Sequence, residues 1–117
     1  MTGVQTCALP ISSVDGRTRE QAGMPLKICE LLATLDGPAY IERVSLDNPA
    51  HIRAAKKAVR KAFEVQLAGK GFSFVEMLST CPTNWGLTPV KAIERLKNDM
   101  IPYYPLGVYK DTGKEAE

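Results

Sequence analysis

A strand–helix–strand pattern in the middle of the chain constrains its fold more than any other feature. The run Ala39–Leu46 (AYIERVSL) is rich in β-branched and aromatic residues, which favours a strand. A strong helix start follows, with Asn48 as the N-cap and Pro49 at the first helical position. Apolar residues then recur at helical spacing, at Ile52, Ala55, Val59, Phe63 and Leu67. This spacing predicts a helix over residues 49–68.

Two glycines, Gly69 and Gly71, close this helix, and a second strand follows them. Phe72–Leu78 (FSFVEML) is a short, mostly apolar run, which is typical of a buried strand in a parallel sheet. A crossover between parallel strands is right-handed almost without exception. The sequence therefore predicts an α/β fold in which strands at about 39–46 and 72–78 run parallel, with the helix on one face.

Two further helices are predicted at about residues 25–36 and 88–100. The first begins at Pro25, and the second has Thr88 as its cap and ends before Pro102. The segment Pro102–Tyr109 is rich in proline and tyrosine, which excludes regular helix and central strand. We expect it to lie extended on a surface, packed against the rest of its subunit or a partner subunit.

Composition excludes several classes of function. The net charge of +2 is too close to neutral to predict nucleic acid or an anionic membrane as a partner. No apolar run approaches the roughly 20 residues that span a bilayer, so a soluble protein is expected. The three cysteines, Cys7, Cys29 and Cys81, form no short-spaced pair, and their odd number argues against a disulfide framework. A reducing, cytoplasmic setting fits best.

Three features outside the central loop are further candidates for a functional role. Cys29 lies on a predicted helix and is interpreted as a small core residue. Nothing near His51 in the sequence suggests a base or ligand role. A basic helix face could dock an acidic ferredoxin, but a solvated face is the simpler interpretation. That face carries Arg53, Lys56, Lys57, Arg60 and Lys61.

The loop Ser79–Pro89 is the best candidate for a chemical site. Cys81 would lie just past the carboxyl end of the second strand, which is where ligands bind in open α/β sheets. Gly86 permits a tight or left-handed turn, and Trp85 can cover the thiol with a large apolar ring. By spacing alone, however, a single cysteine in a loop is a weak signal for a ligand. No catalytic nucleophile–base pair is apparent.

A resemblance to a known family is carried by Gly16-Arg17 and by three longer segments, Leu31–Leu46, Lys70–Val90 and Met100–Lys110. These segments resemble the thiamine-diphosphate-binding beta subunit of the 2-oxoacid:ferredoxin oxidoreductases, and the branched-chain and 2-oxoglutarate members are nearest. In that family the cysteine before Pro-Thr-Asn-Trp-Gly is the last of four thiolate ligands of a [4Fe-4S] cluster. The resemblance implies this metal-ligand role for Cys81, with Trp85 as a cover over the cluster.

The family's other cofactor motifs do not occur in this sequence. A Cys-x-x-Cys pair, a further cysteine, and the Gly-Asp-Gly-Asp region for Mg²⁺ and the diphosphate are absent. The resemblance therefore implies that residues 13–110 are the carboxyl-terminal part of a thiamine-diphosphate-binding domain. Residues 1–12 look like the translation of a common sequencing adapter and, like residues 111–117, are expected to be disordered.

The resemblance implies a function for the intact enzyme. That function is oxidative decarboxylation of a 2-oxoacid to acyl-CoA with electron transfer to ferredoxin, which is an EC 1.2.7 activity. The implied partners are an alpha subunit, gamma and delta subunits in some members, ferredoxin, coenzyme A and the 2-oxoacid. Thiamine diphosphate, Mg²⁺ and a [4Fe-4S] cluster are implied for the intact enzyme. The isolated chain is expected to hold none of them and to be inactive.

The sequence also allows two other functions. One is a small stand-alone α/β interaction module that holds a partner through Pro102–Tyr109 or the basic helix. The other is a thiol enzyme that uses Cys81, which needs a lowered thiol pKa.

Overall fold

The structure is a computed structural model, and it describes residue 20 and residues 23–112. The elements, in order, are α2 (Ile28–Ala33), β1 (Pro38–Ser45), α3 (Pro49–Leu67), β2 (Phe72–Leu78), α4 (Pro82–Trp85), α5 (Pro89–Arg95), the π-helical turn η2 (Leu96–Met100), α6 (Ile101–Tyr103) and β3 (Gly107–Asp111). The predictions made for residues 1–12 and 113–117 lie outside the described residues. Within the described part, no helix is long and apolar enough to cross a membrane.

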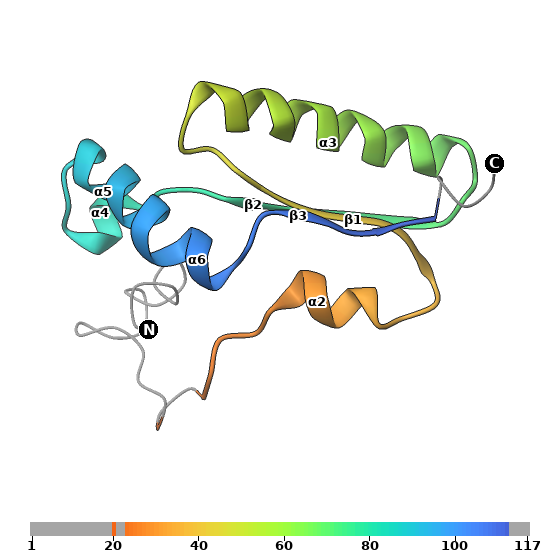
Figure 1. Ribbon diagram of the computed structural model, residues 1–117, viewed down its shortest axis with the longest axis horizontal. Coiled ribbons are helices and arrows are strands. Elements are labelled where there is room, and N and C mark those ends of the chain that lie inside the picture. The colour runs from red at the N-terminus through yellow and green to blue at the C-terminus, as the bar shows by residue number, and fades with distance from the viewer. Residues whose placement is uncertain (1–19, 21–22, 113–117) are drawn as a thin grey trace.

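The strands form one sheet in the order β2-β1-β3. β1 and β2 are parallel, with Ile41 opposite Phe74 and Val44 opposite Met77, so the predicted strand–helix–strand unit is confirmed. α3 covers one face of the sheet, and α2 lies on the opposite face (Figure 1). The short helices α4, α5 and α6 gather beyond the carboxyl end of β2 (Figure 1). The α/β class is therefore confirmed.

α3 begins as its sequence predicts, but its buried face includes only Ala55 of the predicted stripe. The Asn48 side chain accepts a hydrogen bond of 2.8 Å from the His51 backbone N–H, and Pro49 follows. The buried residues are Ala55, Ala58 and Val65, which pack against Val44 and Tyr40 of β1. Small alanines allow the helix to approach the sheet closely.

The larger apolar residues of the predicted α3 stripe lie at the side of the helix instead. Phe63 is 63% exposed and Leu67 is 87% exposed. Together with β2, this side of α3 forms a groove of about 250 Å³, here called the α3–β2 groove. Its lining includes Val59, Phe63, Ser73, Val75 and Met77. The predicted apolar stripe of α3 is therefore only partly buried. The reason is that a three-stranded sheet is too narrow to cover the whole apolar side of the helix.

The predicted helix at 25–36 is shorter than expected. The structure forms α2 only from Ile28 to Ala33, and Cys29 is its one buried residue. The helix ends because both the backbone N–H and the hydroxyl of Thr34 donate to the Leu31 carbonyl, at 3.2 and 2.7 Å. Leu31 and Leu35 are each more than half exposed.

The predicted helix at 88–100 does not end before Pro102. It continues through η2 into α6, which contains that proline. A proline ring inside a helix collides with the carbonyl four residues earlier, and the wider π turn directly before it relieves that contact. The Tyr104 N–H then donates to the Met100 carbonyl at 2.8 Å.

The predicted extended tail, Pro102–Tyr109, is extended only in its second half: Pro102 and Tyr103 are helical, and a third strand of the sheet, β3, begins at Gly107. β3 runs antiparallel to β1, with Arg43 opposite Gly107 and Tyr40 opposite Asp111. Proline is tolerated because Pro105 precedes the strand and the strand lies at an edge. Asp111 was predicted to be disordered, but it belongs to β3 and pairs with Lys61 of α3.

A buried arginine connects four elements of the fold. The Arg43 side chain, fully buried on β1, donates from Nε to Glu76 of β2 at 2.7 Å and from both terminal nitrogens to Glu30 of α2 at 2.8 and 2.7 Å. It also donates to the Tyr109 hydroxyl of β3 at 2.9 Å. The guanidinium carbon lies 5.0 Å from the ring centres of Tyr104 and Tyr109. Its charge is thus fully partnered, as burial requires.

Replacing Arg43 should therefore destabilise the whole fold. Arg43→Leu leaves Glu30 and Glu76 without their cation, and breaking a buried ion pair in this way costs about 3–5 kcal/mol. Equilibrium urea unfolding of the chain measures this loss. The matched control is Arg60→Leu, since the Arg60–Glu64 pair is 84% and 64% exposed. It should cost no more than about 0.5 kcal/mol. Equal losses in the two variants would contradict a central role for Arg43.

The same network predicts a pH dependence of stability. Hydrogen bonding from Arg43 lowers the pKa of Glu30 from its ordinary value of 4.5 to about 2. Because the folded pKa lies below the unfolded one, the stabilisation is complete above the unfolded value and is lost as the pH falls toward the folded value. The difference in urea midpoint between the parent chain and Glu30→Gln should narrow between pH 4.5 and pH 2. A constant difference over this range would contradict the assignment.

Candidate functional site

Cys81 lies just past the carboxyl end of β2, as predicted. It is the N-cap residue of α4, a four-residue helix that the sequence did not predict. The Trp85 N–H donates to the Cys81 carbonyl at 3.0 Å. α4 ends at Gly86, whose φ of 65° is left-handed, which confirms the turn expected there. The thiol of Cys81 is free and the residue is half-buried.

Trp85 joins this loop to a small apolar core. It packs against a cluster of buried side chains at the carboxyl end of β2. That cluster is formed by Leu78, Leu96, Met100 and Tyr104. The guanidinium carbon of Arg95, at the end of α5, lies 5.2 Å from the centre of the Trp85 ring. The indole therefore has a cation on its face and an apolar core beside it.

Two hydrogen-bond donors at this stack have no acceptor. The Trp85 Nε1 and Arg95 Nε atoms are both buried and make no hydrogen bond to any described residue. Leaving a buried donor unsatisfied costs about 1–3 kcal/mol. Buried polar groups in native proteins are almost always paired, so these two donors indicate that an acceptor from outside the described chain belongs here.

An iron–sulfur cluster fits this arrangement as one side of its site. Thiolate and sulfide sulfurs accept N–H hydrogen bonds, and such bonds tune these clusters. A [4Fe-4S] cluster needs four thiolates. In the described part of the chain, no three His, Cys, Asp or Glu side chains lie close enough together to hold a metal ion. Cys81 could therefore supply one ligand, with the other three coming from elsewhere.

Cys29 is a core residue, as predicted, but it has a partner that its helical position does not reveal. Its buried Sγ atom donates to Glu76 Oε2 at 3.2 Å, across a separation of 47 residues. Burial, together with the hydrogen bond to Glu76, raises the pKa of the Cys29 thiol to about 12. This thiol is therefore protonated at neutral pH and chemically inert.

An aspartate–histidine pair at the end of β1 was missed by the sequence analysis. Asp47 is buried, and its Oδ1 atom accepts hydrogen bonds from Ser45 Oγ at 2.7 Å and from His51 Nδ1 at 2.5 Å. Burial acts to raise the pKa of Asp47, but the bonds from His51 and Ser45 outweigh it and hold this pKa below its usual range. The i, i+4 spacing across the helix start is the signal that could have found the pair.

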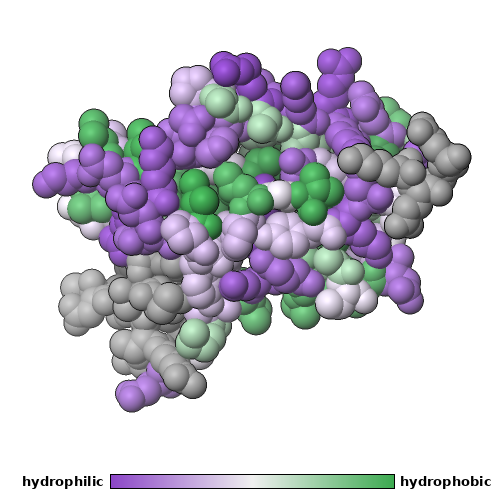
Figure 2. Space-filling view, viewed as in Figure 1, coloured by the Kyte–Doolittle hydropathy of each residue, from purple (hydrophilic) through white to green (hydrophobic). Residues whose placement is uncertain are grey.

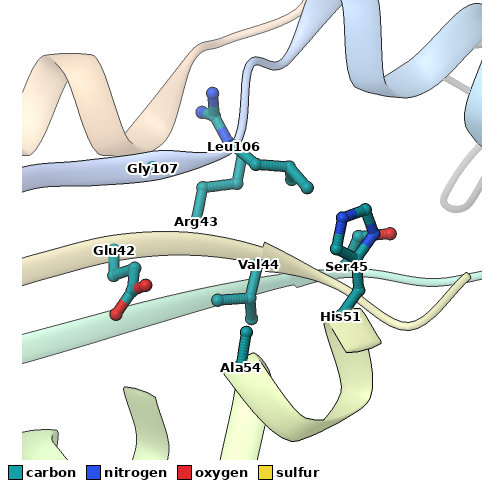
Figure 3. A pocket seen from close by; sticks show the side chains of 8 residues that line it. All are labelled: Glu42, Arg43, Val44, Ser45, His51, Ala54, Leu106 and Gly107. Atoms are coloured by element: carbon teal, nitrogen blue, oxygen red, sulfur yellow. The ribbon is translucent and has the colours of Figure 1, made fainter. Parts of the chain in front are cut away.

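His51 also lines a hollow of about 220 Å³ beside α3. Leu106 lies across this hollow from Val44 and Ala54, and the His51 ring lies near Ser45 (Figure 3). An aspartate fixes the orientation of an imidazole, which can then accept or donate a proton. Ser45 lines the hollow, but its hydroxyl donates to Asp47, and no described contact joins it to the imidazole as a nucleophile to a base. The pair thus links the end of β1 to the first turn of α3, whose N-cap is Asn48.

The basic face of α3 is a solvated surface with internal pairs. Lys61 pairs with Asp111 and lies 5.0 Å from the centre of the Tyr40 ring, and Arg60 pairs with Glu64. Hydrophilic side chains line the α3 side of the molecule, at the top of Figure 2. This favours the simpler interpretation over a dedicated docking surface. The tail proposed for an interaction module is likewise used within the fold, since Tyr109 contacts Arg43.

Comparison with known proteins gives two matches among curated sequences. The chain is 47% identical over 102 residues to the ketoisovalerate oxidoreductase subunit VorA of Methanothermobacter marburgensis. It is 45% identical over 102 residues to the subunit of the same name from Methanothermobacter thermautotrophicus. Each match covers 87% of this chain and 21% of the relative. The chain thus spans about a fifth of the length of the curated relatives that it matches.

No protein-family model and no solved structure matches the chain. The identity to the two VorA subunits nevertheless extends through most of its length, so this chain is homologous to one part of a ketoisovalerate oxidoreductase subunit.

The two described cysteines should differ sharply in reactivity. Iodoacetamide at neutral pH should label half-buried Cys81 well before Cys29, whose thiol is buried and has a pKa of about 12. Mass spectrometry of the Cys29 and Cys81 peptides gives the two rates, and the urea-unfolded chain is the control in which both label. Labelling of Cys81 no faster than a free thiol removes the thiol-enzyme hypothesis. Faster labelling of Cys29 would contradict its burial.

Proposed function

We propose that this chain is the carboxyl-terminal part of the thiamine-diphosphate-binding beta subunit of a 2-oxoacid:ferredoxin oxidoreductase. The observation that carries this proposal is the 47% identity over 87% of the chain to a ketoisovalerate oxidoreductase subunit. The reaction is the oxidative decarboxylation of a 2-oxoacid to acyl-CoA, an EC 1.2.7 activity. Residues outside this chain bind thiamine diphosphate and Mg²⁺, because the chain contains none of the motifs that do so.

Within this enzyme, Cys81 is one of four thiolate ligands of a [4Fe-4S] cluster. Its position at the carboxyl end of β2, in the same short helical turn as Trp85, whose buried indole N–H has no acceptor among the described residues, supports that role. A cluster of this type transfers one electron at a time. The chain's own residues hold one corner of the site through Cys81 and exclude water from it with the Trp85 ring.

The exposed apolar surface of the fold supports the idea that further parts of the enzyme cover it. β2 is an edge strand, and the α3–β2 groove beside it is lined by apolar side chains. Phe63, Phe72 and Met77 around this edge are each about half exposed or more. Large exposed apolar patches mark sites that another part of a protein covers. The proposed partners are the alpha subunit, gamma and delta subunits where present, and ferredoxin, in a cytoplasmic enzyme.

The cluster assignment is tested in an assembled chimeric enzyme. In this chimeric enzyme, the matched 102 residues of the Methanothermobacter marburgensis VorA subunit are replaced by those of this chain, and the subunit is produced with its partner subunits. Cys81→Ala should remove one [4Fe-4S] signal from the electron paramagnetic resonance (EPR) spectrum, and about four iron atoms per subunit should be lost.

Cys29→Ala is the matched control, because it removes the other described thiol. The Cys29 thiol already donates a hydrogen bond to the Glu76 carboxylate and is not proposed to bind iron. The iron content of this variant should equal that of the parent. Retention of every cluster in Cys81→Ala would show that the ligand role is wrong. Loss of a cluster in both variants would show that the effect is structural.

A further inference from the structure

The Trp85–Arg95 stack is the one described feature whose polar groups the fold leaves unused. Trp85 Nε1 and Arg95 Nε are buried donors without acceptors among the described residues. Every other described side chain with a buried nitrogen or oxygen atom finds a partner for it. Arg95 is also absent from the ion pairs of the described chain, which include those of Arg43, Arg60 and Lys61.

The stack lies close to Cys81 through two successive contacts. Trp85 follows Cys81 by one turn of α4, and its N–H donates to the Cys81 carbonyl at 3.0 Å. Arg95 comes from the end of α5 and places its guanidinium carbon 5.2 Å from the Trp85 ring centre. The cation is therefore held by aromatic stacking, and not by a carboxylate, on the residue whose backbone N–H donates to the Cys81 carbonyl. Its charge remains uncompensated among the described residues.

We propose that Arg95, held by Trp85, is a positioning residue that raises the reduction potential of the cluster bound by Cys81. This inference rests on the proposed function, since it needs Cys81 to be a cluster ligand. Reduction adds one electron to the cluster, and a nearby uncompensated positive charge favours the more negative, reduced form. Hydrogen bonds that N–H groups donate to the cluster sulfurs also raise its reduction potential. The two unpartnered donors thereby acquire their acceptor.

The test is a redox titration of the chimeric enzyme, followed by the EPR signal of the cluster. A unit charge on the order of 10 Å from a one-electron centre changes its reduction equilibrium by roughly tenfold at an effective dielectric constant near 20. Arg95→Gln should therefore lower the ratio of reduced to oxidised cluster at a fixed potential by about tenfold. This corresponds to a fall in midpoint potential of about 59 mV.

Three further variants separate this electrostatic effect from a structural one. Arg95→Lys keeps the positive charge, so the midpoint potential of the cluster should stay close to that of the parent enzyme. Arg60→Gln removes the same charge from the exposed side of α3, where its side chain is 84% exposed, and should leave the potential unchanged. Trp85→Phe keeps an aromatic ring but removes the indole N–H, and should lower the potential by less than Arg95→Gln does.

The outcomes distinguish this inference from the proposed function. An unchanged potential in Arg95→Gln, or an equal fall in Arg60→Gln, would overturn the inference and leave Cys81 as a ligand. If Arg95→Gln fails to assemble the cluster, Arg95→Met decides, because it keeps an unbranched side chain on the Trp85 ring without the charge. A parental potential in Arg95→Met overturns the inference, and a fall that Arg95→Lys does not show supports it. Retention of the cluster in Cys81→Ala would instead overturn the proposed function itself.

Discussion

The buried guanidinium of Arg43 is the interaction on which the arrangement of the elements depends. An unpaired charge in a protein interior costs several kcal/mol, so α2, β2 and β3 must all lie where they can supply a partner. Glu30 brings α2 onto the sheet, and Glu76 fixes β2 beside β1. Tyr109 brings β3 to the other side of β1. Because Glu76 lies near the end of β2, the same network positions the loop that carries Cys81.

Local features of the fold could be predicted from the sequence because their causes are local. The Asn48 cap, the parallel strand pair and the bounds of β2 follow from neighbouring residues and short periodicities. The Arg43 network could not be predicted, because its partners lie 13, 33 and 66 residues away along the chain. β3 was missed for the same reason. Tyrosines and prolines indicate an extended segment, but only pairing with β1 makes it a strand.

At the candidate site, too, local features could be predicted from the sequence and contacts between distant residues could not. The position of Cys81 follows from the end of a strand, which the sequence marks clearly. The contact between Trp85 and Arg95 depends on how α5 packs against the loop, which no local pattern specifies. The proposed ligand role of Cys81 comes from the family resemblance and not from spacing, because a [4Fe-4S] cluster needs four thiolates and this loop has one. The unpartnered donors beside it are the structure's own indication of a missing acceptor.

The position of iron relative to Cys81 decides whether this loop is part of a cluster site. Diffraction data collected at the iron absorption edge from the chimeric enzyme locate each iron atom independently of any assumed ligand. We expect an iron atom bonded to Cys81 Sγ, with the Trp85 ring and the Arg95 guanidinium beside the same cluster. Iron atoms found only at other sites, with Cys81 Sγ surrounded by protein, would contradict this expectation.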